Sequence, residues 1–145
     1  MRKVDGIMEL METVSDVRRG ARYQFLRLMK GKNIDLTLEM LEILRLLWNE
    51  DKMNQQDIVN KTHRNKASIT SLLDNMSRRG LVVRTPDAAD KRNNLISLTE
   101  EGRNYRQVLK PIVEEMYHNV YADLSEEEIA KAIALLKKIE NKLNE

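Results

Sequence analysis

The cationic residues of this chain gather in its middle. Between residues 61 and 92, eight Lys and Arg stand against three Asp and Glu, so this segment carries a net charge of +5 while the remainder sums to −3. A local excess of Lys and Arg on a protein that is otherwise close to neutral favours an anion-binding surface. Charge excess taken alone is more typical of an ordinary solvated surface, so the spacing of the residues must decide.

A helix is predicted over residues 65–80, and its two faces differ. Its apolar residues recur at helical spacing and form a stripe that faces the core: Ile69, Leu72, Leu73 and Met76. The opposite face has short hydrogen-bonding side chains and no acid in its first two turns, whereas a solvent-facing helix usually carries Glu–Lys pairs. The candidate binding residues of this face are Asn65, Lys66, Ala67, Ser68, Thr70 and Ser71. Considered alone, the face fits an exposed surface and a binding surface equally well.

A cationic loop joins two predicted strands, residues 81–85 and 94–98. Proline, aspartate and asparagine supply the turn formers of this loop, but turning the chain does not require Lys91 and Arg92. We expect Asp90 to orient the guanidinium of Arg92, because a charge-assisted pair fixes a flexible side chain. A hairpin tip of this kind can reach phosphates or the minor groove of a DNA duplex.

The remaining segments are predicted to be helical. Apolar residues at steps of three and four predict a first helix ending at Gly31–Asn33, a nearly buried helix over 36–49 and a short helix over 54–62 capped by Asn54. After the hairpin, Thr99 begins a long helix through about Tyr121.

Two features are expected in the C-terminal part. Pro111 predicts a kink or a break in the long helix, because proline lacks an N–H and clashes with the preceding turn. Ser125 and Glu128 match the capping box of a final helix. The fold class is therefore mainly α with a small β-hairpin.

Two adjacent helices followed by a hairpin with a cationic tip form the arrangement of a winged helix-turn-helix. The major groove of B-DNA is about 12 Å wide and admits one α-helix, which must expose compact donors and acceptors near its N-terminus. The helix over 65–80 meets this condition, and the hairpin over 81–98, with its cationic tip in the loop at 86–93, is the wing. Arg64 and Arg84 are the expected phosphate contacts, and the DNA-binding lobe is predicted to span about 34–100.

From Leu36 to Gly102 the sequence resembles the MarR (multiple antibiotic resistance regulator) family of winged helix-turn-helix transcription factors. The residues that carry the resemblance are LTLEMLEILRLL at 36–47, NQQDIVNKT at 54–62, KASITSLLDNMSRRGLVVR at 66–84 and DKRNNLISLTEEG at 90–102. The resemblance implies a homodimer formed by helices at about 4–31 and 101–144, bound to an inverted-repeat operator in double-stranded DNA. It further implies recognition helices in successive major grooves, wings in the minor grooves, and Asp90 with Arg92 as the functional pair of the wing.

The sequence departs from the family pattern in three respects. His63 and Arg64 stand where relatives usually have Gly and a small apolar residue before the recognition helix. No cysteine is present, which excludes thiol-based sensing. The two histidines, His63 and His118, have no second histidine nearby, so we expect no metal site.

Composition limits the class of protein. A chain of 145 residues with 41% hydrophobic residues is expected to form a single domain, residues 1–145, around an aliphatic core. The absence of cysteine fits a reducing cytoplasm. Charges interrupt the apolar pattern of residues 1–30, and no apolar run approaches the length of a membrane span, so neither a signal peptide nor a membrane partner is expected.

Three hypotheses of function remain. The leading one is a homodimeric, sequence-specific DNA-binding repressor that is released by a small-molecule effector. The alternative is a winged-helix protein–protein interaction module, which the acid-free helix face at 65–71 disfavours. An enzyme is the weakest hypothesis, because no phosphate loop or activated nucleophile is present, and no cofactor is expected.

Overall fold

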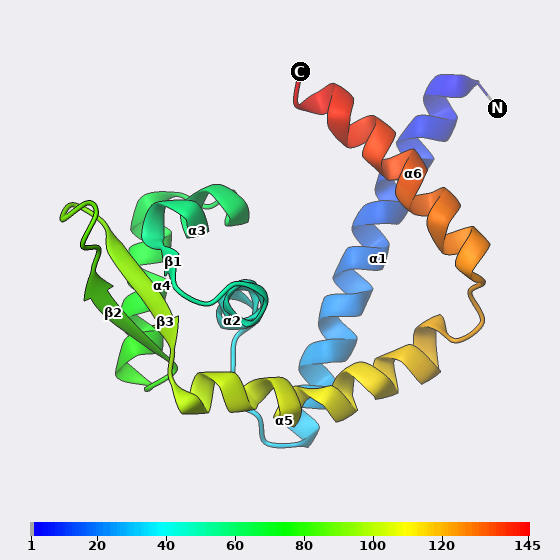
Figure 1. Cartoon of the computed structure of the whole chain (residues 1–145). Coiled ribbons are helices and arrows are strands. Elements are labelled where there is room, and N and C mark those ends of the chain that lie inside the picture. The colour runs from blue at the N-terminus through cyan, green and yellow to red at the C-terminus, as the bar shows by residue number, and fades with distance from the viewer. Residues whose placement is uncertain (1) are drawn as a thin grey trace. The chain divides into compact units, whose positions relative to one another are not determined.

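The computed structural model describes residues 2–145 (Figure 1). In chain order, the elements are α1 (Lys3–Gly31), α2 (Leu38–Asn49), β1 (Met53–Asn54), α3 (Gln55–Thr62), α4 (Lys66–Arg78), β2 (Val82–Pro86), β3 (Asn94–Leu98), α5 (Glu100–Met116), the π-helix η1 (Tyr117–Tyr121) and α6 (Glu126–Leu143). The chain divides into two compact units, one ending at Ile112 and the other running from Val113 to Glu145. The predicted mainly helical fold with a β-hairpin is confirmed.

Side-chain caps start three helices of the first unit, α2, α3 and α4. The side-chain oxygens of Thr37, Asn54 and Asn65 accept the backbone N–H three residues later, at 3.1, 2.8 and 2.8 Å. These bonds satisfy N–H groups that a helix start leaves without partners. The predicted cap at Asn54 is thus confirmed. Because Thr37 caps α2, that helix begins at Leu38 rather than at the predicted Leu36.

The second unit contains the end of α5, the π-helix and α6. The predicted capping box of α6 is confirmed: the Ser125 hydroxyl accepts from the Glu128 N–H, and the Glu128 carboxylate accepts from the Ser125 N–H. Of the predicted kink or break at Pro111, the break is wrong, since α5 continues through Pro111 to Met116, and the kink stays a prediction. A proline inside a helix removes one backbone hydrogen bond, and here the flanking turns of α5 keep their helical conformation.

The sheet has three antiparallel strands in the order β1-β3-β2, one more than the predicted hairpin. In the hairpin Val82 pairs with Leu98, Arg84 with Ile96, and Pro86 with Asn94. Strand β1 adds a short pairing of Met53 with Ile96 on the other edge of β3. Two residues are too few to show the alternation by which a strand is recognised in sequence.

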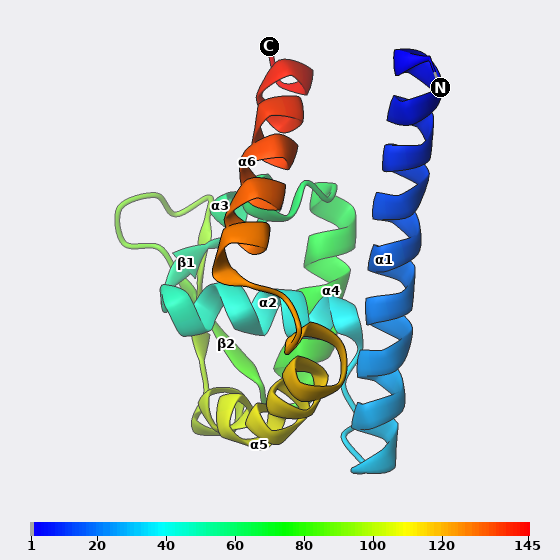
Figure 2. The same cartoon turned by 90° about the vertical axis from the view of Figure 1, so that its right-hand side faces the viewer.

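The core of the first unit lies between the helices and the sheet. Most of its fully buried side chains come from α2, α3, α4 and the strands, and α1 adds Met29: Met29, Ile43, Leu44, Leu47, Ile58, Ile69, Leu73, Met76, Leu81, Ile96 and Ile112. The predicted apolar stripe of α4 faces this core, with Leu72 at its partly buried margin. In both views the loop between β2 and β3 projects from the side of this unit that is opposite to α1 (Figures 1 and 2).

The junction between β3 and α5 is closely packed. Trp48 of α2 donates its indole N–H to the Gly102 carbonyl at 2.9 Å, and the Thr99 hydroxyl donates to the Gly80 carbonyl at 2.6 Å. A Cβ atom at Gly102 would overlap the Leu81 carbonyl oxygen, so only glycine allows this approach of the two backbones. These contacts anchor the start of α5 to the wing and to α2.

Candidate nucleic-acid interface

The first turns of α4 expose a surface without internal bonds. Lys66, Ala67, Ser68 and Ser71 are exposed, and among residues 2–145 the structure gives the side chains of the two serines and Lys66 no hydrogen bond or ion pair. Asn65 is exposed as well, but its side-chain oxygen caps the helix by accepting from the Ser68 N–H. The free hydroxyl and ammonium groups of this face are therefore available to an external partner.

Thr70 differs from the other candidate residues because it is half-buried and bonded inside the protein. Its hydroxyl accepts a hydrogen bond from the side-chain amide of Gln55, at the start of α3, over 2.8 Å. Its backbone carbonyl accepts from Nη2 of Arg84, on β2, over 3.0 Å. One residue of α4 is thus tied both to the preceding helix and to the wing.

Arg84, predicted as a phosphate contact, points inward. Its Nη1 pairs with the carboxylate of Asp74 on α4, its Nη2 reaches the Thr70 carbonyl, and its side chain is only 23% exposed. The Nε atom is buried without a hydrogen-bond partner. The guanidinium is therefore turned mainly toward α4, and only a minor part of the side chain is open to solvent.

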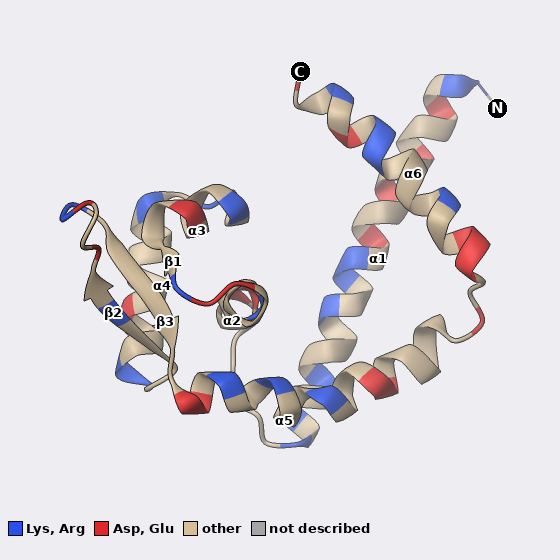
Figure 3. Cartoon of the chain, viewed as in Figure 1, with Lys and Arg blue, Asp and Glu red and all other residues tan. Residues whose placement is uncertain are grey.

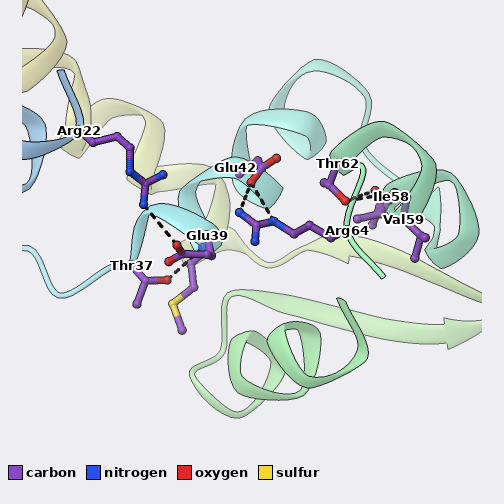
Figure 4. Close-up of polar contacts among 9 residues, drawn as sticks. Arg22, Thr37, Glu39, Glu42, Ile58, Val59, Thr62 and Arg64 are labelled. Carbon is purple, nitrogen blue, oxygen red and sulfur yellow. Dashed lines mark hydrogen bonds and ion pairs between the residues drawn. The ribbon is translucent and has the colours of Figure 1, made fainter. Parts of the chain in front are cut away.

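Arg64, the other predicted phosphate contact, lies in the turn between α3 and α4. Its Nε and Nη2 donate to one carboxylate oxygen of Glu42, on α2, at 3.2 and 3.0 Å (Figure 4). His63, which precedes it, ends α3 in the left-handed conformation with φ of 56°. That conformation is one that glycine adopts most readily, so the histidine keeps the backbone geometry of a glycine turn.

A second acidic residue of α2 lies one turn before Glu42. Glu39 pairs with Arg22 of α1 at 3.5 Å (Figure 4). Its own backbone N–H at the helix start, together with the charges of Arg22 and Arg64, holds the pKa of Glu39 below its ordinary value, and partial burial opposes this shift. The acids of α2 therefore link α1 to the turn that precedes α4.

The tip of the wing is open to solvent. The Asp90 carboxylate accepts from both the backbone N–H and the Nε of Arg92, at 3.1 and 3.4 Å, while the Arg92 side chain is 93% exposed. Lys91 between them is exposed as well. The expected contact between Asp90 and Arg92 is thus present. Charged residues also mark this tip in Figure 3.

A small polar cleft separates the wing from α3 and α4. Its volume is about 210 Å³. Three cations contribute to its lining, which also includes amide and hydroxyl groups: Gln55, Gln56, Val59, Lys66, Thr70, Arg84, Arg92, Asn93 and Asn94. The cleft therefore presents cationic and hydrogen-bonding groups beside the exposed face of α4.

Comparison with known proteins shows the family of the chain. The model of the MarR family matches residues 36–93. The homoprotocatechuate degradative operon repressor of Escherichia coli is 30% identical over 120 residues, which are 83% of this chain and 80% of that protein. The chain belongs to the MarR family.

Two further similarities agree with this membership. The uncharacterized HTH-type transcriptional regulator YdgJ of Bacillus subtilis is 31% identical over 72% of this chain, which covers 63% of the length of YdgJ. The crystal structure of the Staphylococcus aureus MepR–DNA complex superposes with a TM-score of 0.77 at 27% identity, over 93% of this chain and 96% of MepR. The chain is accordingly a DNA-binding transcriptional regulator and not an enzyme.

The described part of this MarR-family chain contains neither a cluster of metal-binding side chains nor a membrane-spanning helix. Within residues 2–145, no three His, Cys, Asp or Glu side chains come together as a metal site would require. No helix in the same range combines the length and the apolar character needed to cross a bilayer.

Sequence reasoning missed several residues of this MarR-family lobe. Gln55 and Gln56 line the cleft, and Glu42 holds Arg64, yet none of them was among the candidate residues. The position of Gln55 directly after a helix cap, on the same lobe as α4, was the available signal. Its contact with Thr70, fifteen residues later, depends on how α3 and α4 pack.

Proposed function

We propose that this MarR-family regulator is a homodimeric repressor whose operator binding is relieved by a small molecule. The repressor role is supported by the similarity to the Escherichia coli operon repressor. We propose a cytoplasmic location as well, because a DNA-binding repressor works where the genome lies, and in a cell without a nucleus that is the cytoplasm. The observation that carries the proposal is the exposed, unbonded face of α4 beside a cationic wing.

The dimer is proposed from apolar surface on the terminal helices. On α1, Val4, Ile7, Met8, Met11 and Val17 are exposed, and on α6, Ile129, Ile133, Leu136 and Leu143 are exposed. Exposed apolar side chains that repeat along a helix typically mark an interaction surface. A second copy of the chain would cover them, with α1 and the segment 101–144 as dimerisation helices around a DNA-binding lobe at about 34–100.

The roles within the lobe follow the groove geometry of DNA. We assign Lys66, Ala67, Ser68 and Ser71 to base edges or phosphates in the major groove, with Asn65 holding the start of the helix and Thr70 at its buried edge. Lys91 and Arg92 enter the minor groove or reach its phosphates, and Asp90 orients Arg92. Arg64 contacts a phosphate when its guanidinium leaves the Glu42 carboxylate and pairs with the DNA backbone instead.

The effector is proposed to be a small anion that occupies the cleft between the wing and α4. Lys66 and Arg92 belong both to this cleft and to the proposed DNA contacts, so a ligand bound there competes with the operator. Such a ligand raises the melting temperature of the free protein by mass action. Thermal-shift measurements with a set of aromatic acids, followed by operator competition, test this part of the proposal.

The oligomeric and DNA-binding parts are tested together. Sedimentation should give the mass of two chains, and footprinting on the gene's own promoter should protect an inverted repeat with half-sites about 34 Å apart. A monomer in solution, or protection of a single asymmetric half-site, would contradict the proposal. Transcription from that promoter should rise when the gene is deleted, and a fall would exclude the repressor role.

A further inference from the structure

Thr70 of α4 makes hydrogen bonds to both α3 and β2, the other two elements of the proposed DNA-binding surface. Gln55 of α3 bonds its hydroxyl, and Arg84 of β2 bonds its backbone carbonyl. Arg84 also pairs with Asp74, one helical turn further along α4. The guanidinium therefore grips α4 at two points on neighbouring turns, and the wing is connected to the recognition helix through it.

The geometry of arginine suits this grip. A guanidinium is planar and carries its donors in a fixed fork, so one side chain can satisfy a carbonyl and a carboxylate at the same time. A lysine ammonium is a compact point charge that does not reproduce this fork. The side chain of Arg84 is mostly covered, whereas Arg92 at the tip of the same wing is almost fully exposed.

We propose that Arg84, with Asp74 and the Thr70 carbonyl, is a positioning residue that sets the wing at a fixed place relative to α4, and is not a phosphate contact. The inference rests on the proposed assignment of α4 and the wing to DNA. If the grip is lost, each element remains folded, but the wing and α4 no longer fit one DNA site together. Specific operator binding then weakens while non-specific binding at low salt persists.

Removal of the Asp74 carboxylate distinguishes the two roles by the sign of its effect. If Arg84 contacts phosphate, Asp74→Ala removes an acid near DNA and frees the arginine, so operator affinity should rise. If Arg84 positions the wing, the same variant should weaken operator affinity about tenfold, because a hydrogen-bonded charge pair is lost. The matched control is Asp57→Ala on α3, since the Asp57 side chain is exposed and bonds neither Thr70 nor Arg84.

Replacement of the arginine by lysine provides the second test. Arg84→Lys keeps the charge, so a phosphate contact would be largely retained, whereas the positioning role predicts a loss similar to that in Asp74→Ala. Combining the two variants should then cost little more than either alone, because both break one grip. Affinity should be measured for the operator and for a scrambled duplex, at a temperature at which each variant remains folded by circular dichroism.

The outcomes separate this inference from the proposed function. Weaker operator binding by Asp74→Ala and Arg84→Lys, with unchanged affinity for the scrambled duplex, supports the positioning role. Tighter binding by Asp74→Ala, or near-normal binding by Arg84→Lys, overturns it. Arg92→Ala is included in the same series: if it leaves operator binding unchanged, the proposed role of the wing itself is wrong.

Discussion

The base and the tip of the wing carry the same residue type in opposite surroundings. At the base, Arg84 is 23% exposed and bonded to two groups of α4. At the tip, Arg92 is 93% exposed and has one loose pair with Asp90 at 3.4 Å. The difference teaches that charge alone does not assign an arginine to DNA. Burial and internal partners decide whether its guanidinium remains available.

The base and the tip of the wing should differ most in their contribution to the stability of the fold. Ile96 lies at the base on β3 and is fully buried, so Ile96→Ala should lower the free energy of unfolding by about 2–5 kcal/mol. Lys91→Ala at the exposed tip should change it by less than about 0.5 kcal/mol. Urea unfolding of both variants checks the comparison, and similar losses would show that the tip is also part of the folded core.

The exposed face of α4 should govern sequence preference. Ser71→Ala should reduce the discrimination between the operator and its single-base variants by about 1–3 kcal/mol at the base that it contacts. Stability should be unchanged, because Ser71 makes no bond inside the described part of the chain. Competition binding with a panel of operator variants measures this effect. A uniform loss over all sequences would instead assign Ser71 to the DNA backbone.

The tip of the wing should contribute to affinity through electrostatics. Arg92→Ala should weaken operator binding about tenfold and reduce the slope of log K against log salt by about 0.9 for one lost phosphate contact. Unfolding should be unaffected, since the side chain is almost fully exposed. Titrations at several salt concentrations give the slope. An unchanged slope combined with altered sequence preference would place Arg92 on base edges.

The exposed Glu39–Arg22 pair, which lies outside the wing, shows how little an exposed ion pair such as Asp90–Arg92 should contribute to stability. The pKa of Glu39 lies below its ordinary value, because of its own backbone N–H first and then Arg22 and Arg64. Ionised Glu39 therefore stabilises the folded state above the ordinary carboxyl pKa, and this contribution disappears as the pH falls through the lowered pKa. Glu39→Gln should cost less than about 1 kcal/mol at neutral pH, since the pair is exposed.

Urea unfolding of wild type and Glu39→Gln across the acidic range checks this sign. The two proteins should differ near neutrality and converge in acid. A difference that grows toward low pH would mean that protonated Glu39, and not its carboxylate, is the favoured form in the folded state.

Much of the fold follows from local signals in the sequence. Apolar spacing indicated the core-facing stripe of α4, and Asn54 and Ser125 indicated helix starts where the structure has them. These signals depend on neighbours within one or two turns. Strand β1 is too short to produce such a signal, and at Pro111 the residues on both sides continue α5 where a break was one of the two predicted outcomes.

The exposure of the candidate residues at the start of α4 could be predicted from the sequence, but the inward turn of Arg84 could not. The exposed residues Lys66, Ser68 and Ser71 were identified because their types differ from those of a solvent-facing helix. The inward turn of Arg84 depends on the distance between β2 and α4, which the packing of Ile69, Leu73 and Ile96 determines. No local pattern distinguishes such an arginine from Arg92.

The bonds at Thr70 have a consequence for engineering. These bonds attach α4 to α3 and β2 through Thr70. The exposed side chains at positions 66, 67, 68 and 71 make no hydrogen bond or ion pair within the described residues that keeps the helix in place. Libraries at these four positions that leave out Pro and Gly, which destabilise a helix, should yield proteins that melt close to the temperature of the parent. On the proposed assignment of these positions to DNA, variants for new promoters can then be selected by binding alone, with Thr70, Asp74 and Arg84 kept constant.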